Sequence, residues 1–172
     1  GYDYTRFNHI VDVAGGRGKL LIDILKSSPT TRGTIFDLPS VLEVTKRNIE
    51  MSSVKDRCTL VTGDFHDNIP VQGDCYIIKF ILHAWNDDDC VNILKNIRKQ
   101  MKPGCKLLAM EMIRPEESSL VDLIDIYFMS TMNGTVRSKD EYENLYQKSS
   151  LQLTRIVNVD PCPVRIMELD LA

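Results

Sequence analysis

A lysine and a histidine lie four residues apart in the segment from Lys79 to Trp85, which reads KFILHAW. The segment includes the end of an apolar run, so its polar side chains should emerge where a strand ends. An imidazole titrates near neutral pH, which makes His83 a natural group to take a proton from a substrate hydroxyl. A lone histidine is more often structural, but its place after a predicted strand favours a general base. Lys79 and Trp85 would flank the same site, and the indole could wall a pocket or stack on a flat ring.

A carboxylate comes at the end of the next apolar run, where Glu111 follows Leu108, Ala109 and Met110. The carboxyl ends of parallel strands meet at one edge of a sheet, so Glu111 could reach His83 and orient its ring. A glutamate that simply faces water at the strand end fits this position equally well. The sequence therefore predicts His83 and Glu111 as a catalytic pair, with a solvent-exposed Glu111 as the alternative.

Three consecutive aspartates, Asp87 to Asp89, raise the question of a magnesium site. Neighbouring residues on a helix point about 100° apart, so their carboxylates do not converge well on one ion. They follow Asn86, a favoured N-cap residue, and the helix dipole stabilises acidic residues in the first turn. A helix start explains these residues, and we predict no metal site.

An apolar strand runs directly into a glycine-rich turn and then a helix in segment 11–25, VDVAGGRGKLLIDIL. Gly15, Gly16 and Gly18 can adopt turn conformations that a Cβ would obstruct, and they let main-chain N–H groups approach a ligand. Such a corner at the start of an alternating α/β chain usually holds a nucleoside-bearing cofactor. A tight turn without a ligand is the alternative.

Two cofactors compete for this turn. The dinucleotide motif GxGxxG requires a third glycine for close helix–strand packing, and Leu21 stands there instead. S-adenosylmethionine (SAM) has no pyrophosphate; it needs the glycine turn and an acid after the second strand for its ribose hydroxyls. Asp37, followed by Leu38, occupies that position. An NAD site also has an acidic residue about 20 residues after its glycine motif, so Asp37 does not distinguish the two cofactors. Only the missing third glycine makes an NAD-dependent oxidoreductase the weaker interpretation.

A third motif, Gly63-Asp64-Phe65, follows the next predicted strand. Asp64 could accept a hydrogen bond from the exocyclic amine of adenine while Phe65 stacks on the ring. Taken alone, the motif is more often a turn with a core aromatic side chain. At the ligand-binding edge of an open α/β sheet it predicts the adenine end of the cofactor site.

Apolar runs rich in β-branched residues alternate with longer amphipathic stretches, which is typical of a parallel sheet covered by helices. Strands are predicted at 10–14, 34–37, 59–62, 75–79 and 106–112. Helices are predicted at 19–27, 40–51, 87–101, 120–132 and 139–149. Ser138 and Glu141 form a capping box before the last of these helices. Segments 151–159 and 164–169 predict two antiparallel strands that close the sheet.

Composition is that of a single-domain globular protein, with 172 residues, of which 43% are hydrophobic and 26% charged. The net charge of −3 and the lack of a basic run argue against nucleic acid as a partner. No apolar run is long enough to span a membrane, and no segment resembles a secretory signal. Five scattered cysteines without a C-x-x-C pair indicate free thiols in a reducing compartment, so we expect a cytoplasmic protein.

The motifs, in this order and spacing, resemble the catalytic domain of the SAM-dependent small-molecule O-methyltransferases. That family includes plant caffeic acid and flavonoid enzymes, acetylserotonin enzymes and bacterial natural-product enzymes. The resemblance covers nearly all of residues 1–172. It implies a Rossmann-like class I methyltransferase fold: an α/β, seven-stranded, mostly parallel sheet with helices on both faces and the last strand antiparallel. It also implies metal-free transfer of a methyl group from SAM to a hydroxyl of a small aromatic acceptor, with S-adenosylhomocysteine (SAH) as product.

The resemblance also implies a role for each site residue. His83 is the general base, and Glu111 is one of two acids that flank it. The cofactor-binding residues are Gly15, Gly16, Gly18, Asp37, Leu38, Asp64, Phe65, Lys79 and Trp85. Gly16 and its turn hold the methionine part, Asp37 the ribose and Asp64 the adenine.

Departures from the family pattern bear on activity. Ala84 replaces the aspartate that usually follows the histidine, and Val136 stands where the second flanking acid is expected. Because a valine cannot orient an imidazole, a SAM-binding regulatory or non-catalytic module is the alternative function. Ala14 replaces the first of three usual glycines, which is a smaller change.

The family also has an N-terminal helical region that forms a homodimer and closes the acceptor pocket. No part of this chain corresponds to that region. We therefore expect the full-length protein to be a homodimer, and the acceptor pocket of this chain to be open on one side.

Overall fold

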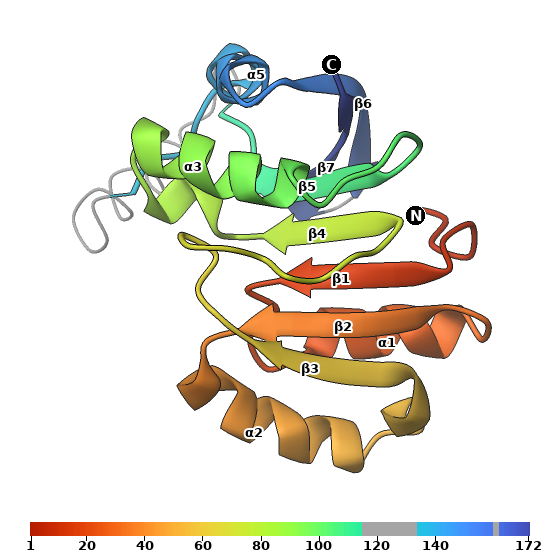
Figure 1. Cartoon of the computed structure of the whole chain (residues 1–172). Coiled ribbons are helices and arrows are strands. Elements are labelled where there is room, and N and C mark those ends of the chain that lie inside the picture. Colours follow the sequence, from red (N-terminus) through yellow and green to blue (C-terminus); the bar gives the residue numbers. More distant parts are fainter. Residues whose placement is uncertain (115–133, 160–161) are drawn as a thin grey trace.

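The computed structural model describes residues 1–114, 134–159 and 162–172. Within them, seven strands form one sheet in the order β3-β2-β1-β4-β5-β7-β6 (Figure 1). The strands are β1 His9–Val13, β2 Arg32–Asp37, β3 Cys58–Thr62, β4 Cys75–Lys79, β5 Lys106–Met112, β6 Leu151–Val159 and β7 Cys162–Leu171. The pairs among β1 to β5 are parallel, and β7 runs antiparallel to both β5 and β6. This confirms the predicted mostly parallel sheet, with β7 as its one reversed strand in the described part of the chain.

Helices cover both faces of the sheet, with α1 behind it and α3 in front in Figure 1. The helices are α1 Lys19–Ser27, α2 Pro39–Glu50, α3 Asp87–Arg98 and α5 Lys139–Lys148, with the 3₁₀ turns η1 Lys55–Arg57 and η2 Leu82–Ala84. One apolar cluster joins α1 and α2 to Ile77, and a second joins α3 and α5 to Ile78. These neighbours face opposite clusters because side chains alternate along a strand. The predicted helix 120–132 lies outside the described residues.

Local hydrogen bonds explain where two helices begin. Asn86 caps α3 by accepting a bond from Asp89 N at 2.9 Å. At the start of α5 the Ser138 side chain accepts from Glu141 N at 3.2 Å, and the Glu141 carboxylate accepts from Ser138 N at 2.7 Å. The capping box predicted from the sequence is therefore confirmed.

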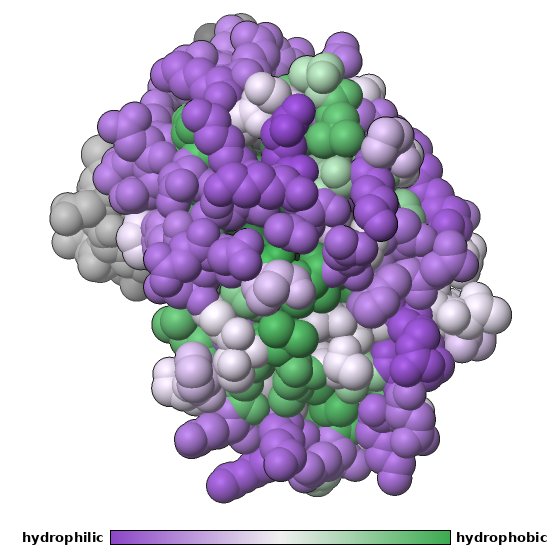
Figure 2. Space-filling model, viewed as in Figure 1, coloured by the Kyte–Doolittle hydropathy of each residue, from purple (hydrophilic) through white to green (hydrophobic). Residues whose placement is uncertain are grey.

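The surface over α3 and α5 is largely hydrophilic, and apolar residues reach the surface near the centre of the sheet (Figure 2). Four cysteines are buried free thiols: Cys58, Cys75, Cys90 and Cys105. In the part of the chain that the structure describes, no helix is both long and apolar enough to cross a membrane.

Candidate functional site

The turns that follow β1, β2 and β3 are hydrogen-bonded to one another at the carboxyl edge of the sheet. Ala14 N donates to Phe36 O at 2.8 Å, and Gly63 N donates to Asp37 O at 3.1 Å. The glycine turn, Asp37 and the Gly63 motif therefore lie side by side. Because β4 is the other neighbour of β1, Lys79 reaches the same edge from the opposite side.

Asp37 is held by backbone groups of two turns. Its Oδ2 accepts a bond from Gly16 N at 2.8 Å, and its Oδ1 accepts one from Leu38 N at 2.7 Å. Each oxygen keeps a lone pair for a further donor. Gly16 has a φ of +56°, and a Cβ added there would meet no atom within 4 Å, so the space above the turn is open. Leu38, 44% exposed, offers an apolar surface next to the carboxylate.

Asp12 lies beneath the glycine turn and is not one of the predicted site residues. It is 2% exposed, and its Oδ2 has no hydrogen-bond partner among the described residues. Burial raises the pKa of Asp12 to about 7; the charge of Lys79 opposes this rise and that of Asp37 adds to it. Gly15 makes room for the carboxyl group, because a Cβ there would stand 2.8 Å from Asp12 Oδ2. The feature of the sequence that could have identified Asp12 is the presence of an acidic residue inside an apolar strand.

A cavity of about 270 Å³ opens above these groups. Its wall consists of Asp12, Ala14, Gly15, Gly16, Arg17, Lys19, Leu20 and Lys79. This wall combines an unpartnered carboxyl oxygen with cationic side chains, which suits a ligand that carries both an ammonium and a carboxylate group. Gly18 does not line the cavity; it precedes α1, and a Cβ there would stand 2.6 Å from Ile35 Cδ1.

An aromatic cluster lies after β3. The rings of Phe65 and Trp85 are edge-on with centroids 6.0 Å apart, and His66 packs against them at 4.7 and 4.4 Å. Asp64 Oδ1 accepts a bond from His66 N at 2.8 Å, which stabilises the turn. The structure thus brings the predicted Phe65 and Trp85 together and adds His66, whose backbone N–H is bonded to the predicted Asp64.

His83 and Glu111 form a buried pair. His83 Nδ1 lies 2.9 Å from Glu111 Oε2, and Glu111 Oε1 accepts bonds from Ile81 N and Leu82 N, both at 2.8 Å. At 1% exposure, Glu111 does not face water, so that alternative is wrong. A carboxylate at this distance favours the neutral imidazole tautomer that carries its proton on Nδ1.

Phe80 links Lys79 to His83. Lys79 Nζ lies 4.4 Å from the centroid of the Phe80 ring, and the same ring is edge-on to His83 at 6.1 Å. Phe80 has a φ of +56°, a backbone region that bulky residues rarely adopt. The cavity above the glycine turn and the His83–Glu111 pair are therefore parts of one continuous edge.

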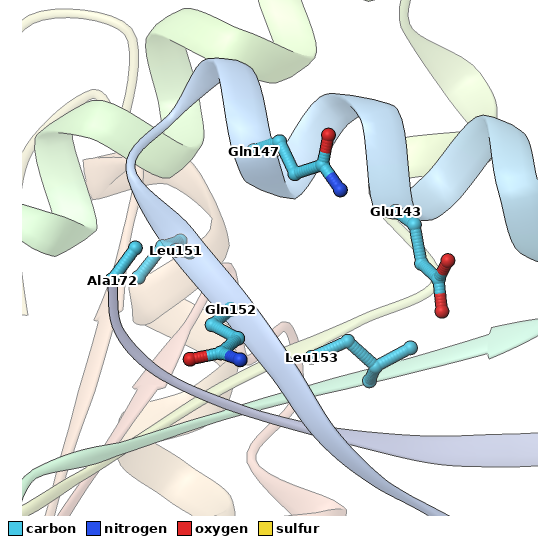
Figure 3. A pocket seen from close by; sticks show the side chains of 6 residues that line it. All are labelled: Glu143, Gln147, Leu151, Gln152, Leu153 and Ala172. Atoms are coloured by element: carbon cyan, nitrogen blue, oxygen red, sulfur yellow. The ribbon is translucent and has the colours of Figure 1, made fainter.

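A larger cavity, of about 430 Å³, lies between α5 and β6 (Figure 3). It is lined by Glu143, Gln147, Leu151, Gln152, Leu153 and Ala172. Because β6 runs parallel to β1, its first residues lie at the amino edge of the sheet, away from the glycine turn. None of the predicted site residues lines it, so the convergence of polar groups identifies the site better than cavity size.

Comparison with protein-family models matches residues 1–152 to the O-methyltransferase domain. The chain belongs to the O-methyltransferase domain family. This confirms the resemblance drawn from the four sequence motifs. Members of the family use SAM, which is the cofactor predicted for the glycine turn.

Two curated relatives show the range of names in this O-methyltransferase family. Mitomycin biosynthesis 6-O-methyltransferase from Streptomyces lavendulae is 37% identical over 171 residues, which cover 98% of this chain and 48% of that protein. Aclacinomycin 10-hydroxylase RdmB from Streptomyces purpurascens is 31% identical over 156 residues, covering 88% of this chain and 42% of that protein. The chain therefore spans about half the length of the curated relatives it matches.

A solved structure shares the fold of this O-methyltransferase domain. The O-methyltransferase NcsB1 from neocarzinostatin biosynthesis superposes with a TM-score of 0.91 at 26% identity, over 99% of this chain and 51% of that chain. NcsB1 was crystallised with SAH and 1,4-dihydroxy-2-naphthoic acid. The agreement over nearly the whole chain confirms the class I methyltransferase fold.

Proposed function

We propose that residues 1–172 form the SAM-binding catalytic domain of an O-methyltransferase that methylates a hydroxyl group of a small aromatic acceptor, with His83 as general base. The observation that carries this proposal is the buried His83–Glu111 pair, at 2.9 Å, on the same sheet edge as the glycine turn. A base is needed because a neutral phenol is a poor nucleophile, whereas its oxygen attacks readily as the proton leaves.

The residues along the edge fit the parts of SAM in order. Asp12 has a carboxyl oxygen without a partner beneath the open glycine turn, where the ammonium group of the methionine part would neutralise it. Asp37 keeps acceptor capacity for the ribose hydroxyls. The adenine would lie among Leu38, Asp64, Phe65 and Trp85. When bound, SAM supplies the electrophilic methyl group.

The protein residues accept the proton and hold the reacting groups in position. His83 Nε2 accepts the proton of the acceptor hydroxyl, and Glu111 holds the ring in the required tautomer and stabilises the imidazolium that results. Two backbone N–H groups, of Ile81 and Leu82, hold the carboxylate in place. Holding acceptor and base in fixed positions is expected to supply much of the catalysis in a methyl transfer.

Replacement of His83 tests the proposed base. In the full-length protein, His83→Gln should lower kcat by roughly 100-fold or more while the Kd for SAM stays within about twofold, because the imidazole acts only on the acceptor. Transfer of a labelled methyl group to 1,4-dihydroxy-2-naphthoic acid and a panel of phenols measures kcat, and calorimetry measures Kd. His9→Gln is a matched control, because His9 lies at the amino end of β1 and is hydrogen-bonded to Thr34. Undiminished turnover by His83→Gln would exclude this base.

A second candidate function is a SAM-binding protein that does not transfer the methyl group. Val136 is 1% exposed at the position of the expected second acid, and a relative of this chain is named a hydroxylase. The two candidate functions differ in whether a methylated acceptor is formed. Labelled methyl groups appear on the acceptor if the chain is a methyltransferase, and SAM is recovered intact with the acceptor present if it is not.

The resemblance implies that the full-length protein is a homodimer whose N-terminal helical region closes the acceptor pocket. Sedimentation of the full-length protein tests this, since a monomer at micromolar concentration would contradict it.

A further inference from the structure

We propose that Arg137 is a positioning residue for His83, which rests on the proposed role of His83 as the base. Arg137 follows directly after Val136, the residue that stands in place of the second acid. Its guanidinium group holds the backbone of the turn that carries His83 and so restricts where the imidazole can lie, whereas Glu111 binds the imidazole itself. We call residues 134–137 the brace of this turn.

Arg137 bonds to carbonyl groups on both sides of His83. Its Nη1 donates to Leu82 O at 2.6 Å and its Nη2 donates to Trp85 O at 2.8 Å. Arg137 is only 4% exposed, so these bonds form away from water, where each is stronger than at the surface. The two carbonyls bound the short turn η2, and fixing both of them restricts where the His83 Cα can lie.

The charge of the buried guanidinium is balanced by Asp87, the first residue of α3. Asp87 Oδ1 accepts bonds from Arg137 Nε at 3.1 Å and from Nη2 at 2.8 Å. A planar fork with five N–H donors can reach two carbonyls and a carboxylate at once, which the point charge of a lysine cannot do. The side chain therefore ties η2 to the start of α3.

The backbone of the brace touches His83 itself. Thr135 N donates to His83 O at 2.8 Å. A Cβ at Gly134 would stand 2.4 Å from His83 O, so only a glycine lets the chain pass at this distance. The His83 turn is therefore bonded at its carbonyl groups by the brace and at its N–H groups by Glu111, so Glu111 is not its sole support.

Arg137 does not take over the role of the expected second acid, because it binds backbone carbonyls and Asp87. An acid would orient the imidazole directly, whereas Arg137 orients the backbone beneath it. A misplacement of about 1 Å can cost 100-fold in rate, so loss of this hold should be visible in turnover. A purely structural Arg137, one that only joins α3 to the segment before α5, would leave the imidazole unchanged in any variant that still folds.

The tautomer of His83 distinguishes these two roles without an acceptor. The chain has three histidines, so long-range ¹H–¹⁵N spectra of the imidazoles can be assigned with single variants. In the SAH-loaded protein we expect His83 to be protonated on Nδ1 and to exchange slowly. In Arg137→Gln we expect a mixture of tautomers and fast exchange, kcat lowered by roughly 10- to 100-fold, and a Kd for SAH within about twofold of the unmodified protein.

Two further variants keep the test decisive. Lys139→Gln removes a cation two residues away that pairs with Glu143 on the surface, and should leave the His83 spectrum unchanged. If Arg137→Gln does not fold, Arg137→Lys keeps the charge without the fork and should still show the mixed tautomer. An unaltered His83 spectrum in the folded Arg137 variant would overturn the inference. A His83 without an Nδ1 proton in the unmodified protein would instead contradict the proposed base, and failure to bind SAH would contradict the proposed cofactor site.

Discussion

Asp12 carries a carboxyl group into the middle of a buried strand, and its surroundings change its chemistry. Burial raises the pKa of Asp12 from its ordinary 3.8 to about 7. The neutral acid is therefore the form that the folded chain prefers over much of the acidic range. A ligand with an ammonium group in the cavity above would favour the carboxylate instead, which couples binding to proton release.

The raised pKa predicts a stability that falls with pH. The unfolded chain loses this proton near pH 4 and the folded chain near pH 7, so the free energy of unfolding declines between those values and is lower above them. Asp12→Asn keeps the group neutral at every pH. We expect the variant to be more stable than the unmodified protein at pH 8, by at most about 4 kcal/mol, with no difference near pH 3.5. Urea unfolding at several pH values measures this, and equal stability at pH 8 would show that Asp12 is not buried as an acid.

The same residue predicts how SAM affinity depends on pH. If the Asp12 carboxylate holds the ammonium group, the Kd for SAM should decrease as pH rises from 6 to 7.5, because less of the site is protonated. In Asp12→Asn the affinity for SAM should be lower, and the Kd should be nearly independent of pH over this range. Calorimetry in buffers of different ionisation enthalpy would also report the released proton. A pH-independent Kd in the unmodified protein would contradict the pairing.

Among the elements, the strand–turn–helix corner contains a local strain. Ala14 has a φ of +56°, in the left-handed region where a Cβ costs roughly 1–2 kcal/mol. Part of that cost remains when a glycine replaces it, because glycine loses more backbone entropy on folding. The corner nevertheless forms, since Ala14 N is bonded to Phe36 O and Gly16 N to Asp37.

Ala14→Gly should therefore stabilise the chain by about 0.5–1 kcal/mol, which corresponds to a rise in Tm of about 1–4 °C for a protein of this size. Differential scanning calorimetry measures the change. Ala109→Gly is the matched control: Ala109 is fully buried in β5, and its replacement should lower Tm. A lower Tm for Ala14→Gly would contradict the prediction that the positive φ of Ala14 destabilises the chain.

The elements could be predicted largely because their signals are local. Alternating apolar runs and capping residues placed the described strands and helices to within a few residues. The side chain of Glu111 was not predictable in this way, because strand position alone allows it to face water or His83. Arg137 escaped prediction for the same reason: its partners Leu82 and Trp85 are more than 50 residues away in the sequence, and only the packing of α3 and α5 brings them together.

At the scale of the whole molecule, the site follows from the order of the strands. The order β3-β2-β1-β4-β5 reverses direction between β1 and β4, and ligands of open α/β sheets bind in the crevice at such a switch point. Asp12 and the glycine turn come from β1, and Lys79 comes from β4. The His83–Glu111 pair comes from the turns after β4 and the end of β5, next along the same edge. The four sequence motifs predicted this arrangement because the family that they resemble has this topology.

Calorimetric titration of the folded full-length protein with SAM, SAH and NAD measures whether this edge binds SAM. We predict micromolar binding of SAM and SAH, at least tenfold weaker binding in Asp37→Asn, and no measurable binding of NAD. Binding of NAD in preference to SAM, or no binding of SAM by a protein whose circular dichroism shows it to be folded, would mean that this edge is not a SAM site.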